Sequence, residues 1–225
     1  MKKYQFKIIT FLIVLFFILG CSPKIYDKSK LTLSSETFNI NQILFRTDGY
    51  YYMEKVYELG DDKSIEMQHG QTKTCAITPI IFYDDGYVRK GEFVFGVKPF
   101  ETEEDKKQAI NQSLLELEKE IEENTFHVQI ENSIWDWGMY SQTKNEILIQ
   151  YYYNFYGNYR LINYTGEVLN DTTIIFKVKS GYAKFPSHVK KIPDGKEEIY
   201  HFRKFRIKPD SSNYIKNNIG EFGEK

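Results

Sequence analysis

The stretch Ile80-Ile81-Phe82-Tyr83-Asp84-Asp85-Gly86-Tyr87-Val88-Arg89-Lys90 contains the clearest indication of the fold. Two runs rich in β-branched and aromatic residues flank an Asp-Gly pair. This arrangement predicts a β-hairpin with a two-residue turn, whose central residues take positive φ. Gly91 is a possible bulge before the second strand continues through residues 92–95. Strands joined in this way are antiparallel.

Further strand-like segments lie on both sides of the hairpin, separated by polar turns such as Thr165-Gly166 and Asn170-Asp171. Their ranges are 50–57, 127–131, 134–140, 146–153, 159–164, 167–169, 172–179 and 198–208. Eight to ten short strands with short connections predict a mainly β fold, either an antiparallel up-and-down barrel or a strongly curved sheet. A β-sandwich is the alternative.

One inserted surface helix is predicted over residues 102–124. Thr102 and Asp105 form a capping-box pattern, and the first turn is acidic, which suits the positive end of a helix. The apolar positions follow helical spacing in a single stripe: Ile110, Leu114, Leu117 and Ile121. Such a helix covers part of a sheet or one mouth of a barrel.

Residues 1–20 have the pattern of a secretory signal peptide. Three lysines precede the apolar run 8–19, which at about 1.5 Å per residue is too short to cross about 30 Å of hydrocarbon. The ending Ile18-Leu19-Gly20-Cys21 resembles the lipobox of bacterial lipoproteins. This resemblance implies that Cys21 is acylated, with palmitate among its chains, and becomes the first mature residue. A signal peptide cleaved elsewhere and an uncleaved anchor are the alternatives.

Removing residues 1–20 leaves 205 of the 225 residues, with 27 basic and 31 acidic side chains and a net charge of −4. We predict a lipidated cysteine and flexible tether at 21–37, a single β-rich domain at 38–210 and a loose polar tail at 211–225. The chain has no basic stripe of the kind that binds nucleic acid.

Catalytic and metal-binding motifs are missing from the sequence, so we expect neither an enzyme nor a cofactor or metal site. Asp61-Asp62 and Asp84-Asp85 fall in turns, where aspartate is favoured for backbone reasons. Cys75 has no intramolecular partner if Cys21 carries lipid, and is most simply a buried small side chain. The four histidines lack metal-ligand spacing: His69, His127, His188 and His201.

Aromatic side chains are the ligand-like feature of this sequence. The candidates are Trp135, Trp137, Tyr140, Tyr50, Tyr52, Tyr151 and Tyr153. They could line an apolar cavity or present rings to a sugar, because tyrosine and tryptophan combine apolar surface with a polar group. The alternative is that they fill the barrel or cover its outside. Strand alternation predicts Trp135 and Trp137 on one side and Asp136 on the other.

Several short phrases resemble uncharacterised small lipoproteins of Bacteroidetes, which are often lipocalin-like: residues 48–51, 137–140, 146–151 and 166–173. The Gly-x-Trp opening of lipocalins is not present. The resemblance implies a lipid-anchored protein of the bacterial cell envelope. An acidic cluster that marks surface export is missing after Cys21, so we expect the outer membrane, facing the periplasm.

Three functions fit these features. The first is a non-catalytic binder of a small apolar ligand. The second is a structural or accessory lipoprotein that docks another envelope protein, which requires a filled barrel and an exposed apolar patch. The third is a hydrolase or glycan-active enzyme, which requires convergent carboxylates or a nucleophile dyad in a cleft.

Overall fold

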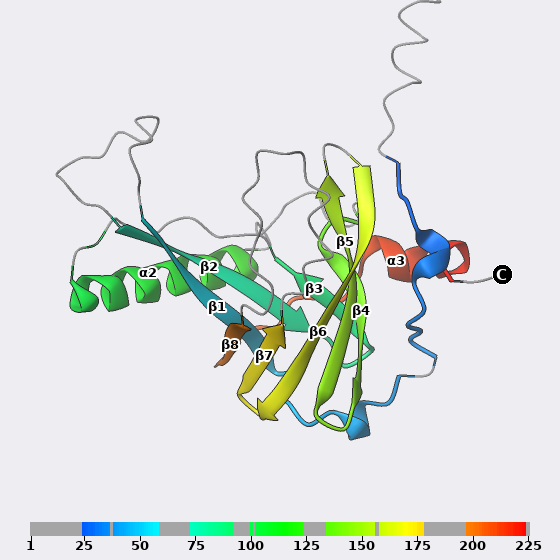
Figure 1. Cartoon of the computed structure of the whole chain (residues 1–225), viewed down its shortest axis with the longest axis horizontal. Helices are drawn as coiled ribbons and strands as arrows, with labels where there is room; N and C mark the ends of the chain where they lie inside the picture. Colours follow the sequence, from blue (N-terminus) through cyan, green and yellow to red (C-terminus); the bar gives the residue numbers. More distant parts are fainter. Residues whose placement is uncertain are drawn as a thin grey trace, which may run out of the picture.

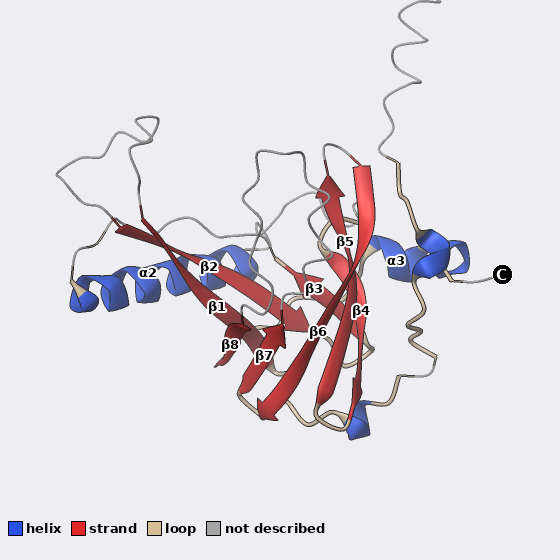
Figure 2. Cartoon of the chain, in the orientation of Figure 1, coloured by secondary structure: helices blue, strands red, loops and turns tan. Residues whose placement is uncertain are grey.

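Eight strands close into one antiparallel barrel in the order β1 to β8 (Figures 1 and 2). The computed structural model describes residues 24–36, 38–58, 73–91, 100, 102–123, 134–155, 158–177 and 197–223. The strands are β1 (Gly49–Glu58), β2 (Lys73–Phe82), β3 (Tyr87–Lys90), β4 (Trp137–Thr143), β5 (Glu146–Phe155), β6 (Asn158–Asn170), β7 (Thr173–Lys177) and β8 (Glu197–Lys204). Each strand pairs with its sequence neighbours and β1 pairs with β8, so the predicted up-and-down barrel is confirmed in place of a sandwich.

The helical segments lie outside the barrel wall. They are η1 (Lys28–Lys30), η2 (Ile40–Gln42), α2 (Glu103–Glu122), α3 (Tyr214–Asn217) and η5 (Ile219–Glu221). None of the helices in the described ranges combines the length and the apolar character needed to cross a membrane.

Side-chain alternation divides the buried residues between two faces of the wall. The inner cluster draws on all eight strands and contains no residue of α2 or α3: Tyr51, Met53, Ile80, Phe82, Val88, Tyr140, Ile147, Ile149, Tyr151, Tyr164, Val168, Ile174, Phe176 and Tyr200. The outer cluster joins strand residues of the opposite parity, including Tyr50, Ile81 and Trp137, to the buried faces of α2 and α3. The barrel wall therefore separates two apolar cores.

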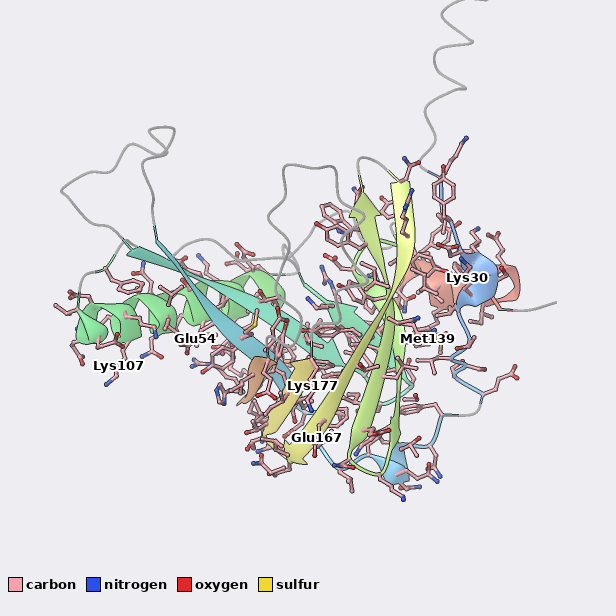
Figure 3. The ribbon with its side chains drawn as sticks, viewed as in Figure 1. Lys30, Glu54, Lys107, Met139, Glu167 and Lys177 are labelled. Atoms are coloured by element: carbon pink, nitrogen blue, oxygen red, sulfur yellow. The ribbon has the colours of Figure 1, made fainter. Side chains whose placement is uncertain are left out.

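The predicted amphipathic helix is confirmed as α2, which packs against the outer face of β2 rather than over a mouth. Thr102 caps it by accepting a 3.1 Å hydrogen bond from the backbone N–H of Asp105. The predicted stripe is buried, and Ala109 and Ser113 extend it. On the neighbouring strand β1, Glu54 lies beside this helix, with its carboxylate 3.9 Å from Lys106 Nζ (Figure 3).

A segment before β1 closes the lower end of the barrel, which lies at the bottom of Figure 1. Phe45 belongs to the inner cluster, with Phe38 and Ile43 packed against it. Two hydrogen bonds hold this plug: Leu44 N–H donates to Gln142 Oε1 at 3.0 Å, and Arg46 N–H donates to Tyr51 Oη at 3.1 Å. Residues 43–46 form a plug rather than a strand, because the Phe45 side chain enters the barrel end while Leu44 stays exposed.

Two predicted turns differ from the structure. The 84–86 loop has three residues, because Tyr83 N–H donates to Tyr87 O and only Gly86 takes positive φ. No turn occurs at Thr165-Gly166, where β6 runs straight through. Gly166 is there for packing, since an added Cβ would lie 2.6 Å from Phe176 Cδ1.

Residues 134–136 form a turn, not the start of a strand. Asp136 has a φ of 66°, and Trp137 N–H donates back to Ile134 O at 3.2 Å. This left-handed residue breaks the alternation that was predicted to place Trp135 and Trp137 on one side. At the chain's last strand, β8 ends at Lys204 rather than at residue 208. The predicted strand 127–131 lies outside the described residues.

Both terminal segments pack on the barrel. The predicted tether does so from residue 24 onward, and the predicted loose tail does so as far as residue 223. Gln150 on β5 explains why the first stays in place: its Oε1 accepts from Thr32 N–H at 2.9 Å and Leu33 N–H at 3.1 Å. The second contributes Ile215, which is fully buried in the outer cluster, and Asn213, whose side chain caps α3. Paired backbone and apolar burial therefore order segments whose composition is that of loops.

We expect Gly166→Ala to lower the free energy of unfolding by about 1–3 kcal/mol, because the new methyl would overpack the interior against Phe176 and the Ile175 carbonyl oxygen. Urea denaturation of the two proteins measures this difference. Gly220→Ala is the matched control, since a Cβ there meets nothing within 4 Å. Equal destabilisation by both substitutions would contradict this account of the packing.

Candidate functional site

The lower half of the barrel interior is filled by aromatic rings. Phe82 lies at the centre, with ring centroids 4.7 Å from Phe45 and 4.9 Å from Tyr140. Phe38 from the plug contacts Tyr140 at 5.0 Å. Tyr51 hydroxyl donates to Asp171 O, which fastens this layer to the β6–β7 turn. A ligand that entered the barrel would therefore have to use the upper half.

Charged and hydroxyl groups also face inward, among them Lys90 at the upper end of β3 and Glu198 on β8. Lys90 shares the inward parity of Val88, and its Nζ lies 5.5 Å and 5.3 Å from the ring centroids of Tyr151 and Tyr164. Glu198 shares the inward parity of Tyr200 and accepts a hydrogen bond from Tyr164 Oη. The two distances from Lys90 Nζ to the tyrosine rings are within the range of a cation–π contact. Lys90, Tyr164 and Glu198, with Tyr151 and Tyr200, form the candidate site, which we call the upper-half cluster.

The register explains how four strands bring this cluster together. Lys90 on β3 pairs with Ile80 on β2, and Gly138 on β4 pairs with Tyr151 on β5. An added Cβ at Gly138 would lie 2.0 Å from Gln150 O, so glycine is needed for the close approach of β4 and β5. This close approach sets the position of the Tyr151 ring beneath the Lys90 ammonium.

Burial dominates the electrostatics of the cluster. It raises the pKa of Tyr164 well above the ordinary value, and the neighbouring Tyr200 and Glu198 raise it further. Burial also raises the pKa of Tyr200, and the nearby Glu198 carboxylate raises it further. Both phenols therefore remain neutral hydrogen-bond donors at neutral pH. The site offers a cation, a carboxylate and neutral hydroxyl groups around an apolar interior.

The structure divides the sequence-predicted ligand residues between the two faces of the wall. Tyr140, Tyr151 and Tyr153 are on the inner side, but Tyr140 belongs to the filled lower half. Tyr50, Tyr52 and Trp137 are on the outer side, against α2 and the C-terminal segment. Trp135 lies in the turn before β4. The seven aromatics therefore do not line one cavity, because strand parity separates them.

The outer members have structural partners. Tyr50 hydroxyl donates to Glu118 Oε1 on α2 at 3.0 Å, and Arg203 on β8 binds the same carboxylate. Trp137 stacks on Tyr83 with ring centroids 5.5 Å apart. These contacts fix α2 and the hairpin to the wall. Tyr50 and Trp137 therefore cover the outside of the barrel, which was the alternative to lining a cavity.

Sequence reasoning missed Lys90, Tyr164 and Glu198. The parity of each strand contained a usable signal, because a lysine in the series Val88, Lys90 and a glutamate in the series Glu198, Tyr200 interrupt inward-facing apolar positions. Parity alone could not say which residues meet across the barrel, since that depends on strand register.

The remaining predicted site residues either have a structural role or lie outside the described residues. Asp84 and Asp85 form ion pairs with Lys208 and Lys216, at 3.2 Å and 2.8 Å, and so fasten the C-terminal segment. His201 is on the outer face of β8 and exposed. The described residues contain no group of three or more side chains that could hold a metal ion. Cys21, the side chain of Cys75 and the remaining candidate ligands lie outside them: Asp61, Asp62, His69, His127 and His188.

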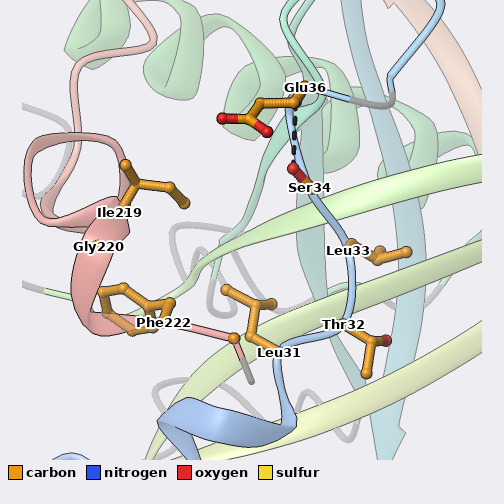
Figure 4. A pocket seen from close by; sticks show the side chains of 9 residues that line it. Leu31, Thr32, Leu33, Ser34, Glu36, Ile219, Gly220 and Phe222 are labelled. Atoms are coloured by element: carbon orange, nitrogen blue, oxygen red, sulfur yellow. Dashed lines mark hydrogen bonds between the residues drawn. The ribbon is translucent and has the colours of Figure 1, made fainter. Parts of the chain in front are cut away.

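A groove outside the barrel lies between residues 31–36 and 219–223 (Figure 4). Its volume is about 490 Å³, and Leu31, Leu33 and Phe222 contribute its apolar side. Polar groups line the rest, including Glu36, whose N–H donates to Ser34 Oγ. None of the seven predicted aromatics lines this groove. The groove was not predicted, since the two segments that form it were expected to be a tether and a loose tail.

Comparison with protein-family models, curated proteins and solved structures finds no match to this chain.

Alkaline pH tests the burial of the tyrosines. Burial raises the pKa of nine described ones: Tyr50, Tyr51, Tyr52, Tyr83, Tyr87, Tyr140, Tyr152, Tyr164 and Tyr200. Below an unfolded pKa of about 10 both states stay protonated, so stability is constant. Above it the unfolded chain ionises first. Each fully buried tyrosine then lowers the free energy of unfolding by up to about 1.4 kcal/mol per pH unit.

Absorbance of phenolate measures this effect. We expect the buried tyrosines to ionise together, at the pH where circular dichroism reports unfolding, while exposed tyrosines titrate earlier. Ionisation of all 18 tyrosines near pH 10 in the folded protein would contradict the described burial.

Proposed function

We propose that this protein is a lipid-anchored envelope lipoprotein that binds a small amphipathic ligand, without catalysis, in the upper half of its barrel. The ligand combines an apolar body with an anionic head, as a fatty acid does. Cys21 provides the anchor, and the barrel provides the binding site. The anchor follows from the lipobox resemblance, and the ligand class follows from the upper-half cluster.

The observation that carries the ligand assignment is the inward-facing lysine at position 90. A charged group in a barrel interior costs desolvation energy, and a barrel that serves only as a packed core gains nothing from it. Its Nζ lies over the rings of Tyr151 and Tyr164, where it can donate hydrogen bonds to the anionic head of a ligand inside the barrel. Met53 and Ile162, also on the inner side, offer apolar surface to the ligand's body.

Docking of another envelope protein is a second candidate function, favoured by two exposed apolar side chains at the lower end. Leu44 in the plug is 57% exposed, and Leu169 near the end of β6 is 53% exposed. The filled lower half suits this function as well. Cross-linking of residue 44 or 169 to another envelope protein, together with a barrel that contains no ligand, would favour docking over ligand binding.

We expect Lys90→Met to weaken binding of a medium-chain fatty acid about 10- to 100-fold, because a charge-assisted hydrogen bond contributes about 1.5–3 kcal/mol. Binding of the corresponding alcohol should hardly change. Displacement of a fluorescent fatty acid measures both affinities. Tryptophan emission is a poorer probe, since Trp137 lies outside the barrel.

Lys177→Met is the matched control for that substitution. Lys177 ends β7 and is exposed on the outer face, so its loss should leave both affinities unchanged. Equal effects of Lys90→Met on acid and alcohol, or no binding of either by the parent protein, would exclude the proposed ligand class.

We expect Cys21→Ala to release the protein from membranes, because two or three acyl chains on one cysteine anchor stably and the variant has none. Fractionation of cells and intact-mass measurement of the parent protein check this. Membrane retention of the variant, together with a parent that has no added lipid mass, would show that the protein has another anchor. A Cys75→Ala variant controls for loss of a cysteine as such.

A further inference from the structure

We infer that the upper end of the barrel faces the bilayer at contact distance, so that the ligand passes directly between the membrane and the barrel interior. This rests on the proposed Cys21 anchor and on the proposed binding site, and it identifies the membrane lipid itself as the ligand's source. The partner is the surface of the bilayer into which the acyl chains insert.

The N-terminal segment joins the barrel at Tyr159, near the start of β6. Lys24 O accepts from Tyr159 N–H at 2.8 Å, and Tyr26 N–H donates to Tyr159 O at 2.9 Å. Residue 25 forms a parallel bridge with Tyr159, close to the start of β6. The packed body therefore begins at Lys24, at the upper end of the β5–β6 pair (Figure 1).

The chain between the proposed anchor and the packed body is short. Cys21 precedes Lys24 by three residues. An extended chain spans at most about 3.5 Å per residue, so the acylated sulfur lies within about 10 Å along the backbone of the barrel's upper end. The headgroup layer on one side of a bilayer is about 5–8 Å thick. A tether this short holds the upper end against the headgroups.

The N-terminal segment descends from the upper end of the wall, where Ile25 forms a parallel bridge with Tyr159, to the plug at Phe45 (Figure 1). The anchor therefore leaves the barrel at the end opposite the plug. Lys90, at the upper end of β3, lies between the filled layer and the membrane side.

The rim of the barrel where the anchor leaves has an exposed aromatic ring and basic side chains. Arg160 has its guanidinium carbon 5.8 Å from the Tyr26 ring centroid, and Lys24 adds a second cationic residue. Tyr26 is 42% exposed. Tyrosines and basic residues are enriched at membrane interfaces, where the ring lies at headgroup level and the cation meets lipid phosphate.

Quenching of a fluorescent label by lipids with a nitroxide headgroup tests this orientation. The full chain is purified with its native acyl groups and placed in phosphatidylcholine–phosphatidylglycerol vesicles. Asn158→Cys places the label at the start of β6, and Asn145→Cys places it in the β4–β5 turn, about 30 Å away along β5. The parent chain, labelled in parallel, gives the contribution of Cys75, which is subtracted.

We expect several-fold stronger quenching at position 158 than at position 145. Insertion of about twenty Gly/Ser residues after Ser22, with an average span of about 25 Å, should abolish that difference while the protein stays on the vesicles. The insertion leaves every packed residue unchanged, so it tests the orientation even if a cysteine variant fails to fold.

Equal quenching at the two positions, or stronger quenching at 145, overturns the inference if intact mass shows an acylated Cys21; the proposed anchor then stands. A Cys21 without acyl groups overturns the anchor and the inference together. A fatty acid that binds the detergent-solubilised parent but does not transfer from vesicles overturns only the route from the membrane, and leaves the proposed binding site intact.

Discussion

Pairing of the first strand with the last is the constraint on which the rest of this structure depends. Residues Gly49–Tyr52 of β1 meet His201–Lys204 of β8, and this short contact closes the sheet. Gly49 makes it possible, because a Cβ there would lie 2.2 Å from Arg203 O. Closure removes the two free strand edges and gives the wall an inside and an outside.

An inside and an outside require two apolar surfaces from every strand, and the aromatic-rich sequence supplies them. The inner surface packs on itself and on the plug, whereas the outer surface needs other elements to cover it. The outer cover consists of α2, the segment that begins at Lys24 and the segment that ends at Gly223. The Glu118 carboxylate shows how this cover is fastened: it accepts from Tyr50 and from Arg203, on the two strands that close the barrel.

The interior is asymmetric along the barrel axis, and this asymmetry relates the fold to the proposed function. Rings and the plug fill the lower half, while Lys90 brings charge to the upper half and lies over the Tyr164 ring. The proposed anchor at Cys21 would leave at the upper end, three residues before the packed body begins at Lys24. With the lower end closed, the proposed ligand would exchange with the membrane rather than with solution.

Local chemistry made much of the fold predictable. The Asp-Gly turn with its β-branched flanks, the Thr102 cap and the stripe from Ile110 to Ile121 each depend on neighbours in the chain, so the hairpin and α2 could be placed. The N-terminal leader pattern is likewise local. The prediction at Gly166 was wrong because glycine can also serve a contact with a distant ring, which a sequence-local rule does not detect.

The sequence by itself thus determined the type and order of the elements: a mainly β fold of short antiparallel strands and one amphipathic helix inserted among them. Only the tertiary structure decided which side of the wall each aromatic occupies, that residues 24–36 and 213–223 are ordered, and that Lys90 meets Tyr164 and Glu198. The physical reason is that parity, register and closure are relations between strands far apart in the chain, and they exist only once the barrel is closed.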